Sequence, residues 1–354
     1  MKTLLMITAV TISTQLFAGQ LPSVCQGVIS NEVAKDPFFV AREMSDGPYQ
    51  GECLANEKRR NIVILKNDDK RLKNVVGAVR SGHVYFANFR HNNRYYIAEY
   101  TPGSIDQTYL AFEKFVEGGV LPKSLAPIGF KGSQMVFTGH IQFRFMLKQG
   151  AALKLYEQTS RKVIQKPTQI TDFSYAMYAI RPESLLGTTY DPFGEGRSAG
   201  YAMSHNFLST HDVAIEYKNY IRPEKARVGQ YKLESSGLDF EKMMMALLKQ
   251  SDGLYKSKKS EIYDTFINNC VTAAYAGIVA GDKHQGKSSP RWYRFYSRHL
   301  IANKTGGREF NPMSVFSDLE RRKILTHRNR SQVKDFNDEI CSLLTDEFRP
   351  EGCE

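Results

Sequence analysis

One cysteine of this chain occupies a position where a folded protein could make it reactive. Cys270 follows Asn269 directly and opens a run of small and apolar residues, 271–280, that predicts a helix. At the start of a helix, the free N–H groups and the helix dipole favour the thiolate over the thiol. A cysteine whose pKa is lowered from about 8.5 in this way can attack a carbonyl carbon. The sequence therefore predicts nucleophilic thiol chemistry at Cys270.

The spacing of the five cysteines separates this one from the others. Cys25 and Cys53 lie near the N-terminus, and Cys341 and Cys353 lie near the C-terminus. We expect a disulfide between Cys25 and Cys53, whereas spacing alone does not decide whether Cys341 and Cys353 pair with each other. Cys270 is then the odd thiol of the chain.

A nucleophilic thiol needs a base that accepts its proton and a group that orients this base. His140 has the most regular context, because it alternates with apolar residues at 141, 143, 145 and 147 in a predicted strand. It would face a cleft that the start of the Cys270 helix could reach, although a histidine at a strand end is often bonded only to backbone. Glu157 on the next predicted strand could hold the imidazole tautomer, or could be an exposed carboxylate.

Further polar residues are candidates for the substrate site. Asn269 is a natural N-cap for the helix, and its amide could also help a backbone N–H to stabilise an oxyanion. Arg144 shares the predicted strand face of His140. His205 and His211 flank a polar segment, where they could line the substrate site or serve no such purpose.

The sequence contains neither of two common zinc-binding motifs. It lacks His-Glu-x-x-His and Cys-x-x-Cys. We expect no metal site, and we expect no cofactor.

The N-terminus and the charge indicate an exported protein. Lys2 precedes a mostly apolar run that ends at Phe17, and Ala18 and Gly19 offer a cleavage site, with an uncleaved membrane anchor as the alternative. We expect a periplasmic or secreted protein after cleavage. The formal net charge of +11 favours anionic partners such as phospholipid head groups or wall polymers. Export, and the lack of any recognition-helix, finger or RNA-binding pattern, argue against nucleic acid.

We divide the chain into four segments of an α+β protein. They are a signal peptide (1–19), a mixed α/β unit (20–128), a thiol-enzyme core (129–283) and a basic helical extension (284–354). In the core, strands at 135–147 and 151–159 are expected to form a β-hairpin, followed by a strand at 171–180. A long loop at 186–210, a strand at 213–220 and a helix at 235–249 follow, and a short helix is expected earlier, at 108–117.

At its candidate site residues the sequence resembles a known family. Gly-His140-x-x-Phe-Arg-Phe, Leu-Lys-Leu-Tyr-Glu157 and Tyr-Asp-Thr-Phe-Ile-Asn-Asn-Cys270-Val-Thr resemble the bacterial periplasmic domain at the N-terminus of the lipoprotein N-acyltransferase Lnb, over roughly residues 130–282. The order of histidine strand and cysteine helix is more distantly similar to circularly permuted papain-like thiol enzymes, including lecithin–retinol acyltransferase.

The resemblance implies a permuted papain-like core, in which an antiparallel sheet packs on the nucleophile helix. It also implies that Cys270 is the nucleophile, that His140 is the base and that Asn269 shapes the helix start. The chain departs from Lnb because it has no transmembrane domain comparable to that of the acyltransferase.

These observations lead to two hypotheses. The first is an exported cysteine-dependent acyltransferase or hydrolase that acts on an acyl lipid, a lipoprotein or a cell-wall amide or ester through an acyl-thioester intermediate. The alternative is a non-catalytic envelope-binding protein, whose basic C-terminal helices dock on anionic lipid or wall polymer.

Overall fold

The computed structural model describes residues 21–115, 139–188, 191, 194–195, 198–218, 226–257, 259–264, 269–284, 319–331 and 334–349. The helices are α1 (Asn31–Ala34), α2 (Lys70–Val76), α3 (Thr210–Lys218), α4 (Phe240–Lys256), α5 (Cys270–Gly281), α8 (His327–Ser331) and α9 (Asn337–Leu343), with short 3-10 turns η1 (Ser23–Cys25), η3 (Glu183–Leu185) and η5 (Asp346–Phe348). The strands are β1 (Val63–Leu65), β2 (Val84–His91), β3 (Arg94–Tyr100), β4 (Ile105–Phe115), β5 (Gly139–Leu147), β6 (Leu153–Glu157), β7 (Thr168–Ile170), β8 (Asp172–Ile180), β9 (Tyr201–Ser209), β10 (Ala226–Lys232), β11 (Ile262–Tyr263) and β12 (Lys334–Asp335).

The described strands form one large, open and mostly antiparallel sheet. Their order is β12-β10-β4-β5-β8-β9-β2-β3-β6-β7, and β1 and β11 add to β2 and β9. The pair β2–β9 is parallel. β4 from the predicted N-terminal unit pairs with β5 from the predicted core, and β12 near the C-terminus pairs with β10. Strands from three predicted segments therefore share one sheet in a mixed α/β fold, and the expected boundary at 128/129 lies outside the described residues.

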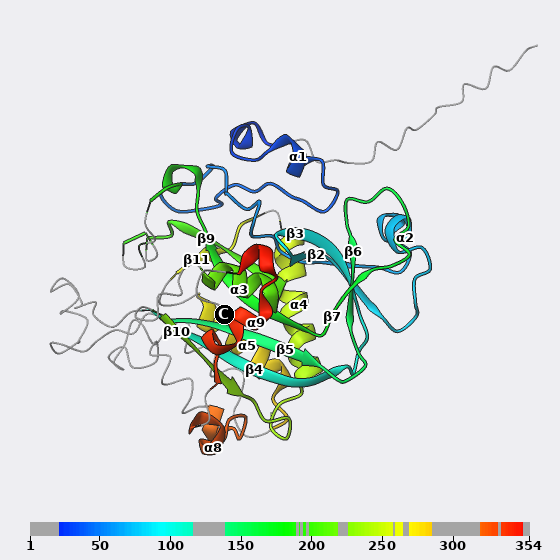
Figure 1. The fold of residues 1–354 in the computed structure, drawn as a ribbon. Coiled ribbons are helices and arrows are strands. Elements are labelled where there is room, and N and C mark those ends of the chain that lie inside the picture. Colours follow the sequence, from blue (N-terminus) through cyan, green and yellow to red (C-terminus); the bar gives the residue numbers. More distant parts are fainter. Residues whose placement is uncertain are drawn as a thin grey trace, which may run out of the picture.

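Helices cover both faces of this sheet (Figure 1). On one side, α4 and α5 pack against strand residues such as Phe143 and Tyr175, and Ile278 of α5 belongs to this core. On the other side, α3 and α9 pack against residues such as Leu208, and Ile340 of α9 belongs to that core. We call these sides the α5 face and the α3 face. Because successive strand residues point to opposite faces, the strand sequence decides which side chains meet which helices.

The close packing of α4 and α5 follows from their sequences. Asp239 caps α4 by accepting a hydrogen bond from the Lys242 backbone N–H at 3.0 Å, which places the methionine- and leucine-rich stripe of the helix against the sheet. In α5, a Cβ atom added at Gly277 would lie 2.7 Å from Leu247 Cδ2. The small residues that predict α5 thus also allow it to approach α4.

The predicted β-hairpin between 135–147 and 151–159 is wrong. β5 pairs with β4 and β8, whereas β6 pairs with β3 and β7. The turn between the two strands does exist, with Gly150 at a φ of 80°. The alternation of apolar residues shows which face each side chain takes, but it does not select the neighbouring strand.

Three further segments differ from their sequence-based expectations. Residues 108–115 of the predicted short helix belong to β4, much of the predicted strand 213–220 belongs to α3, and the predicted loop 186–210 contains β9. Every residue of β9 is buried, although its sequence is partly polar. Internal hydrogen bonds compensate this burial, since the backbone N–H of His205 donates to Asn61 Oδ1 at 2.8 Å and Ser204 Oγ donates to the carbonyl of Arg59 at 2.9 Å.

The cysteine prediction is confirmed for the N-terminal pair. Cys25 and Cys53 form a disulfide with their Cα atoms 5.0 Å apart, Cys341 is also disulfide-bonded, and Cys270 is a buried thiol outside any disulfide. Within the described residues, no helix combines the length and the apolar character that crossing a bilayer requires.

Candidate active site

The thiol of Cys270 lies at the first position of a well-capped helix. Asn269 has an extended backbone, and its side-chain oxygen accepts hydrogen bonds from the N–H groups of Val271 at 2.9 Å and Thr272 at 3.1 Å. In return, Thr272 Oγ1 accepts a hydrogen bond from the Asn269 N–H at 2.8 Å, which completes a capping box. The prediction that Asn269 is the N-cap is confirmed, and the twelve-residue helix directs its positive end toward Cys270.

Apolar side chains of three strands surround this thiol. Cys270 is 7% exposed and belongs to a cluster with residues of α5, β8, β9, β11 and η3, namely Met177, Leu185, Tyr201, Met203, Tyr263 and Ala273. Met177 lies on the same face of β8 as Tyr175, which is part of the core beneath α4 and α5. The site is therefore on the α5 face, at the end of the sheet where β8 terminates.

One hydrogen-bonded pair of polar side chains lies on the same face. Tyr175 on β8 and His205 on β9 are both fully buried, and the Tyr175 hydroxyl lies 2.5 Å from His205 Nδ1. His205 stands opposite Met177 in the β8–β9 register, so its ring projects to the α5 face beside the cluster that contains Cys270. His205 Nε2 is buried without a hydrogen-bond partner among the described residues.

The electrostatics of this pair oppose a role for His205 as a proton acceptor. Burial lowers the pKa of His205 to about 3, so the ring is neutral at pH 7 and weakly basic. Burial also raises the pKa of Tyr175 well above its usual value, and negative charge on Glu261 and Cys270 raises it further. The pair can donate hydrogen bonds to an anion, but it cannot readily take a proton from the thiol.

The structure does not bring His140 and Cys270 together. His140 lies on β5 with its side chain on the α3 face, where its ring centroid is 5.7 Å from that of Tyr178. Burial lowers the pKa of His140 to about 4, partly opposed by Glu216, and its Nε2 atom has no hydrogen-bond partner among the described residues. The predicted alternation of the strand holds, but α5 packs on the apolar face that this alternation creates, so the sheet separates the two residues.

His140 instead adjoins a buried cluster of charges. Glu216 on α3 forms ion pairs with Arg59 and Arg90, and it accepts a hydrogen bond from the Tyr178 hydroxyl at 2.8 Å. Burial alone would raise the pKa of Glu216, but Arg90 and Arg59 lower it to about 2. The cations and carboxylates of this cluster pair with one another, which is typical of a structural network.

The other predicted site residues are dispersed. Glu157 is exposed at the end of β6 and pairs in register with Tyr96 on β3, so it cannot orient His140. Arg144 is buried, and its guanidinium donates to Asp172 on β8 at 2.6 Å and to Glu339 on α9 at 2.6 Å.

His211 lies in the first turn of α3, away from the α5 face. Its ring lies 5.8 Å from that of His91 and 5.6 Å from that of Phe348, and burial lowers its pKa, opposed by Asp212. Of the residues predicted for the site, only Cys270, Asn269 and His205 lie on the α5 face.

The sequence gives no signal that Tyr175 pairs with His205. Tyr175 looks like any core aromatic in an apolar strand, and its pairing with His205 depends on β9, which the sequence had indicated as a loop. Only the pairing of β8 with β9 brings the two side chains together.

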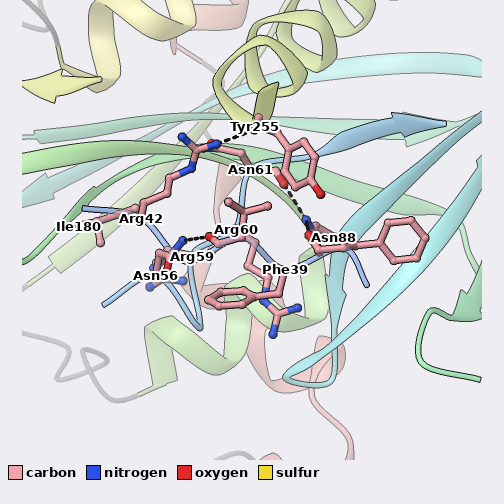
Figure 2. Close-up of a pocket in the computed structure, with 11 residues that line it drawn as sticks. Phe39, Arg42, Asn56, Arg59, Arg60, Asn61, Asn88, Ile180 and Tyr255 are labelled. Carbon is pink, nitrogen blue, oxygen red and sulfur yellow. Dashed lines mark hydrogen bonds between the residues drawn. The ribbon is translucent and has the colours of Figure 1, made fainter. Parts of the chain in front are cut away.

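A small pocket elsewhere in the molecule does not contain the thiol. Figure 2 shows that it lies between the N-terminal segment and the end of α4, and its lining consists of Phe38, Phe39, Val40, Arg42, Asn56, Arg59, Arg60, Asn61, Asn88, Ile180 and Tyr255. The Arg42 guanidinium donates to the carbonyls of Leu254 and Tyr255 at 2.6 Å, where the free carbonyls at the C-terminus of α4 attract a cation. Arg60 forms an ion pair with Asp36 at 2.5 Å. These groups are occupied by contacts within the chain, so the pocket offers few of them to a ligand.

Neither a metal cluster nor a known relative identifies the site. In the part of the chain that the structure describes, no group of three His, Cys, Asp or Glu side chains could hold a metal ion. No family model matches the chain, and no curated protein and no solved structure shows significant similarity to it. The resemblance to the periplasmic domain of Lnb, and with it the permuted papain-like core, remains a prediction.

Proposed function

We propose that this protein is a cysteine-dependent acyltransferase or hydrolase, in which the Cys270 thiolate attacks an ester, thioester or amide carbonyl. The observation that carries this proposal is a reduced thiol at the capped start of a twelve-residue helix, on the same sheet face as the Tyr175–His205 pair. The helix N-terminus favours the anionic sulfur and any oxyanion that forms beside it. A thiol at a helix N-terminus has the character of a nucleophile.

The reaction follows from the state of the groups around the thiol. His205 is too weakly basic to take the proton and His140 is on the α3 face, so the thiol ionises to solvent before attack. The sulfur then bonds to the carbonyl carbon, and the tetrahedral intermediate expels an alcohol, thiol or amine that takes a proton from water. Water or an amine attacks the resulting thioester and releases the thiolate.

The charge of the whole chain supports the proposed substrate class. The formal charge of +11 favours an anionic surface such as an envelope lipid or a wall polymer. An acyl lipid, a lipoprotein or a cell-wall amide or ester is the proposed substrate, and the periplasm or the cell exterior is the proposed location. The Cys25–Cys53 disulfide supports an oxidising compartment.

Trapping the acyl-enzyme tests this proposal. The full chain is incubated with a panel of p-nitrophenyl esters and acyl thioesters, and intact-protein mass spectrometry measures the covalent adduct. We expect a hydroxylamine-sensitive acyl adduct on the wild type and none on Cys270→Ser, which retains a similar volume at the same position. His140→Ala and His205→Ala test the contribution of each histidine to acylation, and we expect His140→Ala to retain it.

Two outcomes would contradict the proposal. An inert Cys270 with no adduct from any donor would exclude thiol catalysis. Salt-sensitive binding to anionic vesicles that survives Cys270→Ala, in a protein without acylation activity, would support the non-catalytic envelope-binding protein instead.

A further inference from the structure

Exposed lysine and arginine side chains gather where three segments of the chain meet. The segments are 232–242, 281–284 and 319–329, which contain the end of β10, the start of α4, the end of α5 and the start of α8. The backbone N–H of Glu234 donates to the carbonyl of Ile324 at 2.8 Å. The backbone N–H of Lys283 donates to the carbonyl of Gly237 at 3.0 Å. We call the surface of these segments the basic face, and α8 marks it at the lower edge of the molecule in Figure 1.

Close packing sets the positions of the lysines on the basic face. A Cβ atom at Gly237 would lie 2.5 Å from the backbone carbonyl oxygen of Lys323, so a larger residue would separate the two segments. Gly237 therefore contacts the backbone at both Lys283 and Lys323. At the end of β10, Asn329 Nδ2 donates to the carbonyl of Lys232 at 3.1 Å. The lysines thus lie on neighbouring segments of one surface.

The charges of these segments are sorted by exposure. All their lysines and arginines except Arg322 are exposed, namely Lys232, Lys242, Lys283, Arg321, Lys323 and Arg328. All their carboxylates are partly or fully buried, namely Glu234, Asp239, Glu241, Asp282 and Glu320. Two of these carboxylates bind within the face, since Asp282 forms an ion pair with Arg322 at 2.8 Å and Glu234 accepts a hydrogen bond from Asn329 at 2.6 Å. The basic face therefore presents mainly positive charge to the solvent.

The chemistry of the basic face fits an extended anionic surface. Lysine carries a compact, hydrated charge on a flexible stem, which suits attraction to many head groups rather than the forked recognition of one anion. The exposed large apolar side chains of the described residues lie outside these segments, so the attraction would be electrostatic and would involve no insertion. The Cys25–Cys53 disulfide supports an oxidising compartment, where lipid head groups are available and nucleic acid is not the expected partner.

We propose that the basic face docks this protein on the head groups of an anionic phospholipid bilayer. The inference goes beyond the reaction proposed for Cys270 and does not depend on it. Cys270 and the basic face lie at opposite ends of the twelve-residue helix α5, about 18 Å apart along its axis. Docking and thiol chemistry can therefore be measured separately.

Co-sedimentation of the full chain with lipid vesicles tests the docking. The vesicles contain phosphatidylcholine alone or phosphatidylcholine mixed with phosphatidylglycerol. We expect binding only to the phosphatidylglycerol vesicles, and weaker binding as salt screens the charges. Replacing Lys232, Lys283 and Lys323 by glutamine should lower the affinity about fivefold for each lysine and about a hundredfold for all three. These side chains are exposed, so the triple variant should fold.

A matched variant separates the basic face from the charge of the whole chain. Lys35, Lys66 and Lys70 are exposed lysines near α1 and α2. Replacing these three by glutamine lowers the net charge by the same amount, and we expect the affinity for phosphatidylglycerol vesicles to change much less. An equal loss of affinity in the two triple variants would overturn the assignment to the basic face.

Other results would also reject the docking proposal. They are an absence of binding to phosphatidylglycerol vesicles, and binding to isolated cell-wall polymer or to nucleic acid in place of the vesicles. Cys270→Ser should bind vesicles like the wild type, and the Lys232, Lys283 and Lys323 variant should retain acylation by a soluble ester. Loss of vesicle binding with intact acylation would therefore reject the docking alone, whereas vesicle binding without acylation would reject only the thiol chemistry.

Discussion

At the scale of single residues, Asn269 fixes the position at which α5 begins. Its side-chain oxygen accepts hydrogen bonds from two backbone N–H groups that no residue within the helix can satisfy. Its own N–H is bound by Thr272 Oγ1. The position of the Cys270 thiol thus depends on a neighbour whose role is structural.

Removing this cap should lower the stability of the protein by a measurable amount. Asn269→Ala loses the acceptor for the N–H groups of Val271 and Thr272, and the expected loss in the free energy of unfolding is about 1 kcal/mol. Urea denaturation followed by circular dichroism measures it. Asn269→Ser is the matched control, because a serine oxygen can cap the same N–H groups and should restore most of the stability. Equal stability of the alanine and serine variants would contradict the capping role.

At the scale of elements, the contact between α4 and α5 fixes the depth at which the nucleophile helix lies. α5 carries glycine and alanine where it faces α4, and Gly277 contacts Leu247 directly. A larger residue at 277 would push α5 away from α4, and with it the start of the helix away from β8. The position of the thiol therefore depends on a contact between two helices that lies away from the thiol itself.

A substitution at Gly277 should expose this dependence. A Cβ atom there would meet Leu247 Cδ2 at 2.7 Å, so Gly277→Val must displace the leucine and should destabilise the protein by about 1–3 kcal/mol. Ala276→Val adds a β-branched side chain at a partly exposed position of the same helix, and its effect should be smaller. Thermal unfolding and the alkylation rate of Cys270 measure stability and site geometry together. The assignment of a tight interface fails if the two valine variants are equally stable.

At the scale of the whole molecule, the sequence predicts elements better than it predicts their pairing. The strands β3 and β8, the helix α5 and its cap at Asn269 are accessible from alternation, small-residue runs and capping chemistry. The order of the strands in the sheet is not accessible in this way. β5 and β6 are consecutive in the chain, yet residues of each pair with residues 40 or more positions away, such as Leu147 with Ile105 and Glu157 with Tyr96. Such pairings depend on tertiary contacts that no local window contains.

The same limit explains what was missed at the site. Alternation correctly separated His140 from the apolar side chains of β5, and an apolar helix such as α5 packs on the apolar side of a strand. The two patterns together already place His140 and Cys270 on opposite faces. Tyr175 and His205, in contrast, meet only because β9 is a buried strand, which its polar residues concealed.

The buried histidines should make the stability of the whole protein depend on pH. Burial lowers the pKa of His140 and of His91 to about 4, with His211 lowering that of His91 further, whereas both would titrate near 6.5 in the unfolded chain. Between these values the unfolded state binds more protons than the folded state, so the free energy of unfolding rises with pH. The stabilising contribution is complete above pH 6.5 and is lost as the pH falls from 6.5 toward 4.

Denaturation at a series of pH values checks this expectation. Urea unfolding between pH 6.5 and 5 lies largely above the range in which carboxylates titrate, so the slope in this window reports mainly on histidines. His140→Gln should flatten the slope, because one group that must stay neutral in the fold is gone. His327→Gln alters an exposed histidine and is the matched control, with no expected change. An unchanged slope in His140→Gln would mean that this ring accepts a proton in the folded protein as easily as in the unfolded chain.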